Sequence, residues 1–322
     1  MTVLITGANG FLGGAVTNAL ADRGVAVRGA VRSAHATSDM PCNCVSVGEV
    51  NGTTDWSKAL EGVTSVVHLV ARTHVMNERG RGDLQDYRPV NVEGTRRLAD
   101  QAAEAGVQRL VFVSSVKVNG ERTRGQPFRA DDAPEPEDAY GISKWEAEQQ
   151  LADVSARTPL ETVVVRPPLV YGPGVKGNFA RLIKLVERGL PLPLGAIDNR
   201  RSLVALPNLV DLLVRCVDAP NAAGRTFLVS DGEDVSTPRL IRMLGEASGR
   251  RAPLVPIPTA LLHLAGRLTG RGEQVERLCG SLQVNISDTR ETLGWTPPVK
   301  LRDALRDTVA GESGNSFSSS KA

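Results

Sequence analysis

The sequence predicts an α/β fold in which a doubly wound parallel sheet is followed by a smaller C-terminal domain. One observation is that the apolar run Val3-Leu4-Ile5 leads directly into a glycine loop, after which apolar residues take up helical spacing. A second is that apolar, β-branched runs recur at 25–31, 45–47, 63–70, 109–115 and 162–165, with helical patterns at 87–105 and 138–151. Strands that alternate with helices are typical of parallel sheets.

The glycine loop between the first strand and the first helix predicts a dinucleotide site. Gly7 permits the tight turn, Gly10 lets a pyrophosphate approach the backbone, and Gly13 lets the helix pack closely on the strand. The helix N-terminus supplies free N–H groups and a positive dipole end for the phosphate. The spacing differs from G-x-G-x-x-G, but the position directly after an apolar strand favours a cofactor site over a purely structural turn. The expected contacts are Gly7, Asn9, Gly10, Phe11, Leu12 and Gly13.

The end of strand 25–31 is expected to touch the adenosine ribose of the cofactor. NAD-preferring proteins usually place an acid there, whereas this chain has Val31-Arg32-Ser33. Arg32 and Ser33 can hold the 2′-phosphate of NADP, so the sequence favours NADP(H) over NAD(H). The alternative is a solvated surface arginine.

Other strand ends are also expected to lie along the cofactor, because ligands in such sheets bind beyond the carboxyl ends of the strands. His68, inside an apolar run, is expected to be a hydrogen-bonded core histidine. The additional cofactor contacts expected after strands 45–47 and 63–70 are Glu49, Val50, Leu69, Val70 and Ala71.

Proton-transfer chemistry is predicted from a later strand and helix. Strand 109–115 ends in Ser114 and Ser115, and after a polar surface excursion Asp138 is a plausible N-cap for the next helix. Tyr140 and Lys144 are four residues apart, so both point from one helix face. A free tyrosine has a pKa of about 10, and a nearby ammonium and an oxidised nicotinamide both favour the phenolate.

These residues together resemble the extended short-chain dehydrogenase/reductases, in the nucleotide-sugar epimerase/dehydratase group. The resemblance covers the loop 6–13 and Tyr140-Gly-Ile-Ser-Lys144, and it continues through segments 166–174, 199–202 and 288–297. It implies a Rossmann-type sheet, with Ser115, Tyr140 and Lys144 as catalytic residues and Asn91 holding the site together. It also implies a UDP-linked sugar substrate and a homodimer built through two helices per subunit. Further contacts that it implies are Asn91, Tyr140, Lys144 and Pro167 for the cofactor, and Ser115, Asn178, Leu194 and Arg201 for the substrate.

The resemblance also divides the chain. Residues 1–168 are expected to form the NAD(P)-binding domain, to which part of 202–232 returns, and residues 169–312 the substrate domain. Residues 313–322 are expected to be a disordered tail. A net charge of +2 gives no argument for nucleic acid, four scattered cysteines predict no metal site, and no apolar run is long enough to span a bilayer. The expected location is the cytoplasm.

Two reactions use the same catalytic residues. Segment 115–121 is similar to enzymes that reduce UDP-4-keto-6-deoxy-N-acetylhexosamines for surface polysaccharides, and Arg32 suits NADPH, so the sequence favours a 4-reductase. The alternative is a UDP-hexose 4-epimerase, acting on UDP-glucose or UDP-N-acetylglucosamine, with retained NAD. A non-catalytic dinucleotide sensor is a further alternative, disfavoured by Tyr140 and Lys144. A dehydratase is disfavoured because Ser114-Ser115 lacks the acids of its Thr-Asp-Glu stretch.

Overall fold

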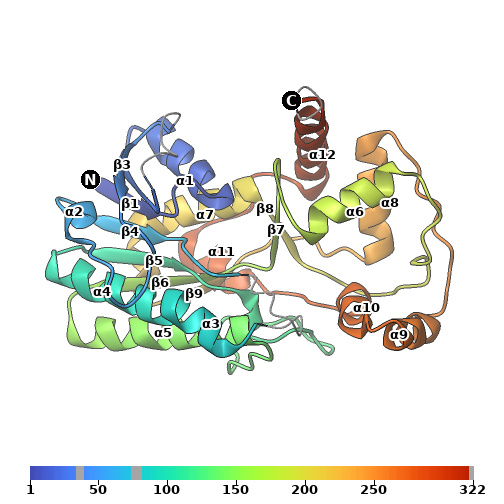
Figure 1. Cartoon of the computed structure of the whole chain (residues 1–322), viewed down its shortest axis with the longest axis horizontal. Coiled ribbons are helices and arrows are strands. Elements are labelled where there is room, and N and C mark those ends of the chain that lie inside the picture. Colours follow the sequence, from blue (N-terminus) through green and yellow to red (C-terminus); the bar gives the residue numbers. More distant parts are fainter. Residues whose placement is uncertain (34–39, 74–81, 319–322) are drawn as a thin grey trace.

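A seven-stranded, wholly parallel sheet forms the first part of the molecule in the computed structural model, which describes residues 1–33, 40–73 and 82–318 (Figure 1). The strand order is β3-β2-β1-β4-β5-β6-β9. The strands are β1 (Thr2–Thr6), β2 (Ala26–Val31), β3 (Asn43–Ser46), β4 (Ser65–His68), β5 (Arg109–Val113), β6 (Glu161–Arg166) and β9 (Thr226–Leu228). The order reverses at β1 and β4, which is where dinucleotides bind in doubly wound sheets.

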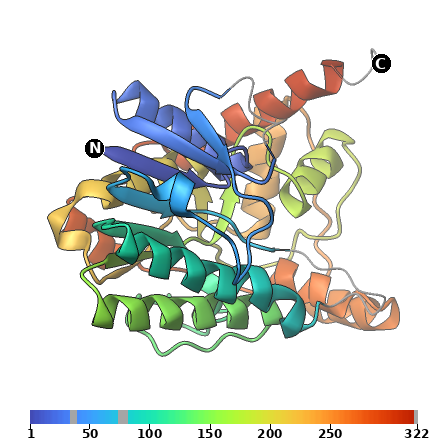
Figure 2. The same cartoon turned by 60° about the vertical axis from the view of Figure 1, so that its left-hand side comes forward.

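Helices cover both faces of this sheet, as Figure 2 shows. On one face lie α1 (Phe11–Asp22) and α7 (Leu206–Asp218), and on the other lie α2 (Ser57–Leu60), α3 (Leu84–Arg88), α4 (Gly94–Glu104) and α5 (Ala139–Arg157). Side chains of β1 alternate between two cores: Val3 and Ile5 pack in the core that includes α1 and α7, whereas Leu4 packs in the core with α4 and α5. A strand buried on both faces reads as a continuous apolar run, which explains Val3-Leu4-Ile5.

The helix expected over 87–105 is divided in the structure. A π-helical turn, η2 (Pro89–Glu93), joins α3 to α4, and the amide of Gly94 donates to the carbonyl of Pro89. Proline lacks an N–H and interrupts the regular α-helical bonding, so a wider turn forms at this point. The turn places Asn91 inside the molecule, where it is fully buried.

A second part of the molecule carries a third core. Its parallel strand pair is β7 (Leu169–Tyr171) and β8 (Leu203–Ala205), and its helices are α6 (Asn178–Glu187), α8 (Thr237–Ser248), α9 (Thr259–Leu268), α10 (Gly272–Cys279) and α12 (Leu301–Ser318). Tyr171, Phe179, Leu203, Ile241 and Leu305 pack together there. Between β8 and α8 the chain returns to the seven-stranded sheet, where α7 packs beside α1 and β9 pairs with β6. α11 (Ser287–Leu293) also packs near β9, and the short turns are η3 (Val116–Val118) and η4 (Pro220–Ala222).

The last helix is longer than the sequence predicted. The expected tail begins at residue 313, but α12 continues to Ser318, and residues 319–322 lie outside the described part. The apolar face of 301–309 nucleates the helix, and without a proline each further residue can add one hydrogen bond. Among the described residues, no helix is both long and apolar enough to cross a membrane.

Candidate active site

The glycine loop is shaped to receive a phosphate. Gly7 has φ +67°, a conformation that suits glycine, and a Cβ on Gly13 would lie 2.1 Å from the Gly7 carbonyl oxygen. Gly10 caps α1 without a side chain, and no acidic residue lies in the first turn. The free N–H groups of this helix end therefore face an open loop, and these residues fit the pyrophosphate of a dinucleotide.

A buried hydrogen-bond chain fixes the end of β4 beside this loop. His68 Nδ1 lies 2.8 Å from the Thr6 hydroxyl, and His68 Nε2 lies 3.0 Å from the Thr95 hydroxyl. The Thr6 oxygen also accepts from the amides of Leu69 and Val70. Burial lowers the pKa of His68 to about 3, so the ring is neutral. The prediction of a hydrogen-bonded core histidine is confirmed.

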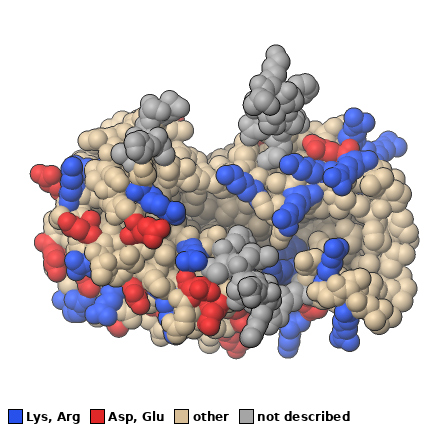
Figure 3. All heavy atoms as spheres, viewed as in Figure 1, with Lys and Arg blue, Asp and Glu red and all other residues tan. Residues whose placement is uncertain are grey.

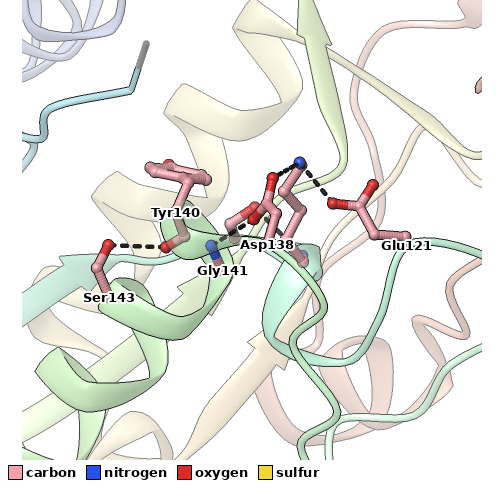
Figure 4. Close-up of polar contacts among 7 residues, drawn as sticks. Glu121, Asp138, Tyr140, Gly141 and Ser143 are labelled. Atoms are coloured by element: carbon pink, nitrogen blue, oxygen red, sulfur yellow. Dashed lines mark hydrogen bonds and ion pairs between the residues drawn. The ribbon is translucent and has the colours of Figure 1, made fainter. Parts of the chain in front are cut away.

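Asn91 ties the β4 loop to the start of α5. Its Oδ1 accepts from the Arg72 amide at 2.8 Å, and its Nδ2 donates to the Arg72 carbonyl and to the Ser143 hydroxyl. Ser143 in turn donates to the carbonyl of Tyr140 at 2.8 Å, as Figure 4 shows. Asn91 thus acts on the position of Tyr140 through the backbone.

Tyr140 stands in the first turn of α5, which is anchored from the other side by Asp138. The Asp138 carboxylate accepts from the Gly141 amide at 2.7 Å and pairs with Lys117, whose ammonium also lies 2.6 Å from Glu121 (Figure 4). A Cβ on Gly141 would lie 2.9 Å from the Lys117 carbonyl oxygen, so α5 packs tightly on the turn after β5.

That turn begins at Ser115. The Ser115 hydroxyl caps it by accepting from the Lys117 amide at 3.2 Å, and the Val116 amide bonds to the carbonyl of Pro167 at 3.0 Å. The ends of β5 and β6 and the start of α5 therefore meet at one place, and Ser115 and Tyr140 belong to it.

Lys144 is fully buried beneath Tyr140. Its ammonium lies 3.9 Å from the centroid of the Phe112 ring, and burial lowers its pKa to about 7, opposed by the charge of Glu148. Glu148 is held in turn by Arg166 through two bonds of 3.0 and 2.6 Å and by the hydroxyl of Ser114.

The sequence analysis missed this network. Its signal was present, because Glu148 follows Lys144 by one helical turn and Arg166 opens the segment 166–174 that carries the resemblance. The network also explains Ser114, because its hydroxyl donates to Glu148. Of the two serines, Ser115 therefore stays the one predicted to contact the substrate.

The pKa of Tyr140 is raised above its ordinary value, mainly by burial and further by Asp138 and Tyr87, whose ring centroid lies 6.2 Å away. The expectation that the Lys144 ammonium and an oxidised nicotinamide together favour the phenolate concerns the protein with its cofactor bound, and it stays a prediction.

At the adenosine end, Arg32 and Ser33 are exposed just beyond β2. The Ser46 hydroxyl bonds to the carbonyl of Arg32 at 3.1 Å, which joins β3 to this turn. Glu49 is exposed, and Val50 packs against Gly94, where a Cβ would lie 2.7 Å from a Val50 methyl. Residues 34–39, which follow Ser33, lie outside the described part.

Among the expected substrate contacts, Arg201 is anchored most firmly. Its guanidinium donates to the carbonyls of Arg277 and Gly280 at 2.8 and 3.0 Å. Burial lowers its pKa, with Arg277 acting in the same direction and Glu121 against it.

Asn178 is exposed in the first turn of α6, and Leu194 is half-buried against the third core. In the described residues no hydrogen bond joins either of them to Tyr140, so both stay predictions. In Figure 3 a hollow lies between the two parts of the molecule, and blue basic side chains gather beside it over α6 and α8.

Comparison with known proteins gives one family. The model for the "NAD dependent epimerase/dehydratase family" matches residues 3–230. A UDP-glucose 4-epimerase of Vibrio cholerae is 46% identical over 311 residues, which cover 96% of this chain and 94% of that protein. An N-acetyl-α-D-glucosaminyl-diphospho-ditrans,octacis-undecaprenol 4-epimerase of Escherichia coli O157:H7 is 26% identical over 327 residues, covering 96% and 95%.

Solved structures agree on the fold. A UDP-glucuronic acid 4-epimerase from Bacillus cereus in complex with NAD matches with a TM-score of 0.80 at 22% identity, covering 98% of this chain and 99% of that one. MoeE5 in complex with UDP-glucose and NAD matches with a TM-score of 0.78 at 24% identity, covering 98% and 100%. The predicted α/β fold with a doubly wound sheet is confirmed.

Proposed function

Because the chain belongs to the NAD dependent epimerase/dehydratase family, we propose that it is a UDP-hexose 4-epimerase that retains NAD through turnover. The observation that carries this proposal is the 46% identity, over 96% of the chain, to a protein described as UDP-glucose 4-epimerase. The sequence analysis gave this activity as its alternative and favoured the 4-reductase. The relative supports the alternative, while the nicotinamide cofactor and the nucleotide-sugar family are common to both.

The proposed roles follow from the positions of three side chains. Bound NAD supplies a hydride acceptor for C4 of the sugar and a positive charge near the phenol. Tyr140 takes the proton from the oxygen on C4 and later returns it, while Ser115 hydrogen-bonds the same oxygen. Lys144 provides the charge that balances the phenolate. NAD held beside Tyr140 and Lys144 would also supply the returning hydride, and a sugar ring that rotates in the site would receive it on its opposite face.

Arg201 is proposed to bind the diphosphate of the substrate. A guanidinium is suited to two parallel bonds with phosphate oxygens, and its anchoring by the carbonyls of Arg277 and Gly280 orients it before substrate arrives. Its neighbour Arg200 is exposed and carries the same charge. Asn178 and Leu194 are proposed to enclose the nucleotide, as the resemblance implies.

Arg32 is the residue that favours NADP(H) over NAD, because its guanidinium can bind the 2′-phosphate that only NADP(H) carries. Its exposure supports the alternative of a solvated surface arginine. The deciding experiment is to denature the purified, undialysed protein and identify the nucleotide that is released. The proposal expects NAD at close to one molecule per chain. An empty protein, or one that carries NADP(H), would instead support an exchanging reductase.

Three further expectations stay predictions. The homodimer is tested by the mass of the protein in solution. The division near residue 168 is tested by limited proteolysis, and the cytoplasmic location by fractionation of cells that express the chain.

A further inference from the structure

The outer face of α9 is apolar. Leu261, Leu264 and Leu268 are spaced by three and four residues, so they line one side of the helix, and they are 54, 53 and 79% exposed. The opposite side packs on α10 through the buried Gly266, where a Cβ would lie 2.7 Å from a Val275 methyl. The leucines are therefore turned away from α10 and exposed.

The exposed charged side chains on α9 and directly after its end are basic. Residues 259–271 contain two exposed arginines, Arg267 and Arg271, and no aspartate or glutamate. Arg267 lies on α9 itself, and Arg271 follows its end. The neighbouring helix α10 carries two acids, Glu273 and Glu276, and Glu276 is already 2.6 Å from Arg122 and 3.5 Å from His263.

These two features select among the possible partners. A second copy meeting this face about a two-fold axis would bring the same basic residues together, and like charges repel at that distance. An exposed leucine stripe bordered by arginines matches the way in which amphipathic helices lie in an anionic bilayer surface, with arginine side chains reaching the headgroups.

We infer that α9 docks the protein on a membrane surface rich in anionic phospholipid. The arrangement of the molecule permits this, because α9 and α10 lie at the end of the long axis, away from the main sheet, in both Figure 1 and Figure 2. Through α10, whose Arg277 carbonyl anchors Arg201, docking would hold the substrate domain next to the lipid.

The test is co-sedimentation of the full chain with vesicles. Mixed vesicles of phosphatidylglycerol and phosphatidylcholine are compared with vesicles of phosphatidylcholine alone, at low and at high salt. Binding is expected on the mixed vesicles and is expected to weaken as salt screens the arginines. The variant L261S/L264S/L268S is expected to lose about tenfold or more in affinity. The variant R267Q/R271Q is expected to lose about 25-fold, from two basic residues near the surface.

A matched control removes two exposed arginines elsewhere. R302Q/R306Q changes the net charge by the same amount on α12 and is expected to bind vesicles like the wild type. Turnover of UDP-sugar without vesicles should be equal in all these proteins, which shows that they fold; vesicle binding itself does not depend on the proposed reaction. The inference is overturned if the wild type ignores the mixed vesicles or if all variants bind alike. It is also overturned if the leucines instead support a dimer that the triple variant dissociates.

Discussion

Burial opposes charge on both members of the Tyr140 and Lys144 pair. The pKa of Tyr140 is raised, so near neutral pH its phenol stays protonated, whereas the pKa of Lys144 is lowered to about 7, so its ammonium readily loses its proton there. When a phenolate and an ammonium are present together, the attraction between the two charges offsets part of the cost of burying each one. The site is therefore suited to moving one proton between tyrosine and substrate while the lysine stays in place.

Replacing Tyr140 with Phe tests this role. The variant should lose about 10²- to 10⁴-fold in turnover, because it lacks the hydroxyl that moves the proton. NAD binding should be nearly unchanged, since the ring keeps its packing beside Tyr87. Turnover and bound nucleotide are measured on the same preparation. Tyr171→Phe, which removes a hydroxyl bonded to Asp231 at 2.7 Å, is the control and should keep turnover. Retained activity in Tyr140→Phe would refute the chemistry.

Lys144 should also make stability depend on pH. Its pKa is 10.5 when unfolded and about 7 when folded, so between these values the unfolded chain binds more protons and stability rises with pH. From pH 6 to pH 9 this group alone should add roughly 2–3 kcal/mol to the free energy of unfolding.

Lys144→Met should remove that rise and be the more stable protein at pH 6. The measurement is urea denaturation of both proteins, stripped of cofactor, at the two pH values. If the stability of the wild type and of the variant depended on pH in the same way, burial of the Lys144 ammonium would not be destabilising the folded protein at pH 6.

At the scale of elements, the passage from β1 into α1 depends on close backbone contact. The Gly7 carbonyl lies so near Gly13 that a Cβ there would sit 2.1 Å from its oxygen and 2.9 Å from the Ala8 Cα. Backbone atoms cannot yield as the end of a flexible side chain can. The glycine loop, which is proposed to hold the phosphate, and the packing of α1 therefore depend on the same backbone contact.

Gly13→Ala should therefore disturb the loop, lowering stability by about 1–3 kcal/mol and releasing the bound nucleotide. Gly14→Ala is a matched control, because its Cβ would meet only the Ala8 carbonyl oxygen at 3.8 Å. That variant should be as stable as the wild type or better by about 0.5–1 kcal/mol, since alanine favours helix. The measurements are the thermal unfolding temperature and the amount of bound nucleotide in each variant. Equal values for Gly13→Ala and Gly14→Ala would contradict the proposed role of close backbone packing at Gly13.

The elements that the sequence predicted well carry local signals. The glycines before α1, the Asp138 cap of α5 and the spacing of Tyr140 and Lys144 all lie within a few residues of the structure they specify. The π-helical turn at Pro89 was missed because proline marks an interruption without saying which wider turn replaces it.

The whole arrangement of the site depends on contacts between distant parts of the chain. Arg166 meets Glu148 and Asn119 only because β6 lies beside β5 and α5 packs over both. No spacing in the sequence specifies that meeting, and the same holds for Arg201 and the carbonyl of Arg277. The proposed catalytic residues were predicted from a motif, whereas the groups that contact Lys144 and position Tyr140 could be identified only from the fold.

In the proposed reaction, the protein inverts the configuration at C4 of the sugar and keeps the same cofactor throughout. The most direct measurement is proton NMR of UDP-glucose, and separately of UDP-N-acetylglucosamine, incubated in D₂O with purified protein and no added nucleotide. The account predicts that at least one is converted to its 4-epimer with the C4 hydrogen retained, because hydride returns from the same cofactor. No conversion of either sugar, together with NADPH consumption on a 4-keto UDP-sugar, would contradict it.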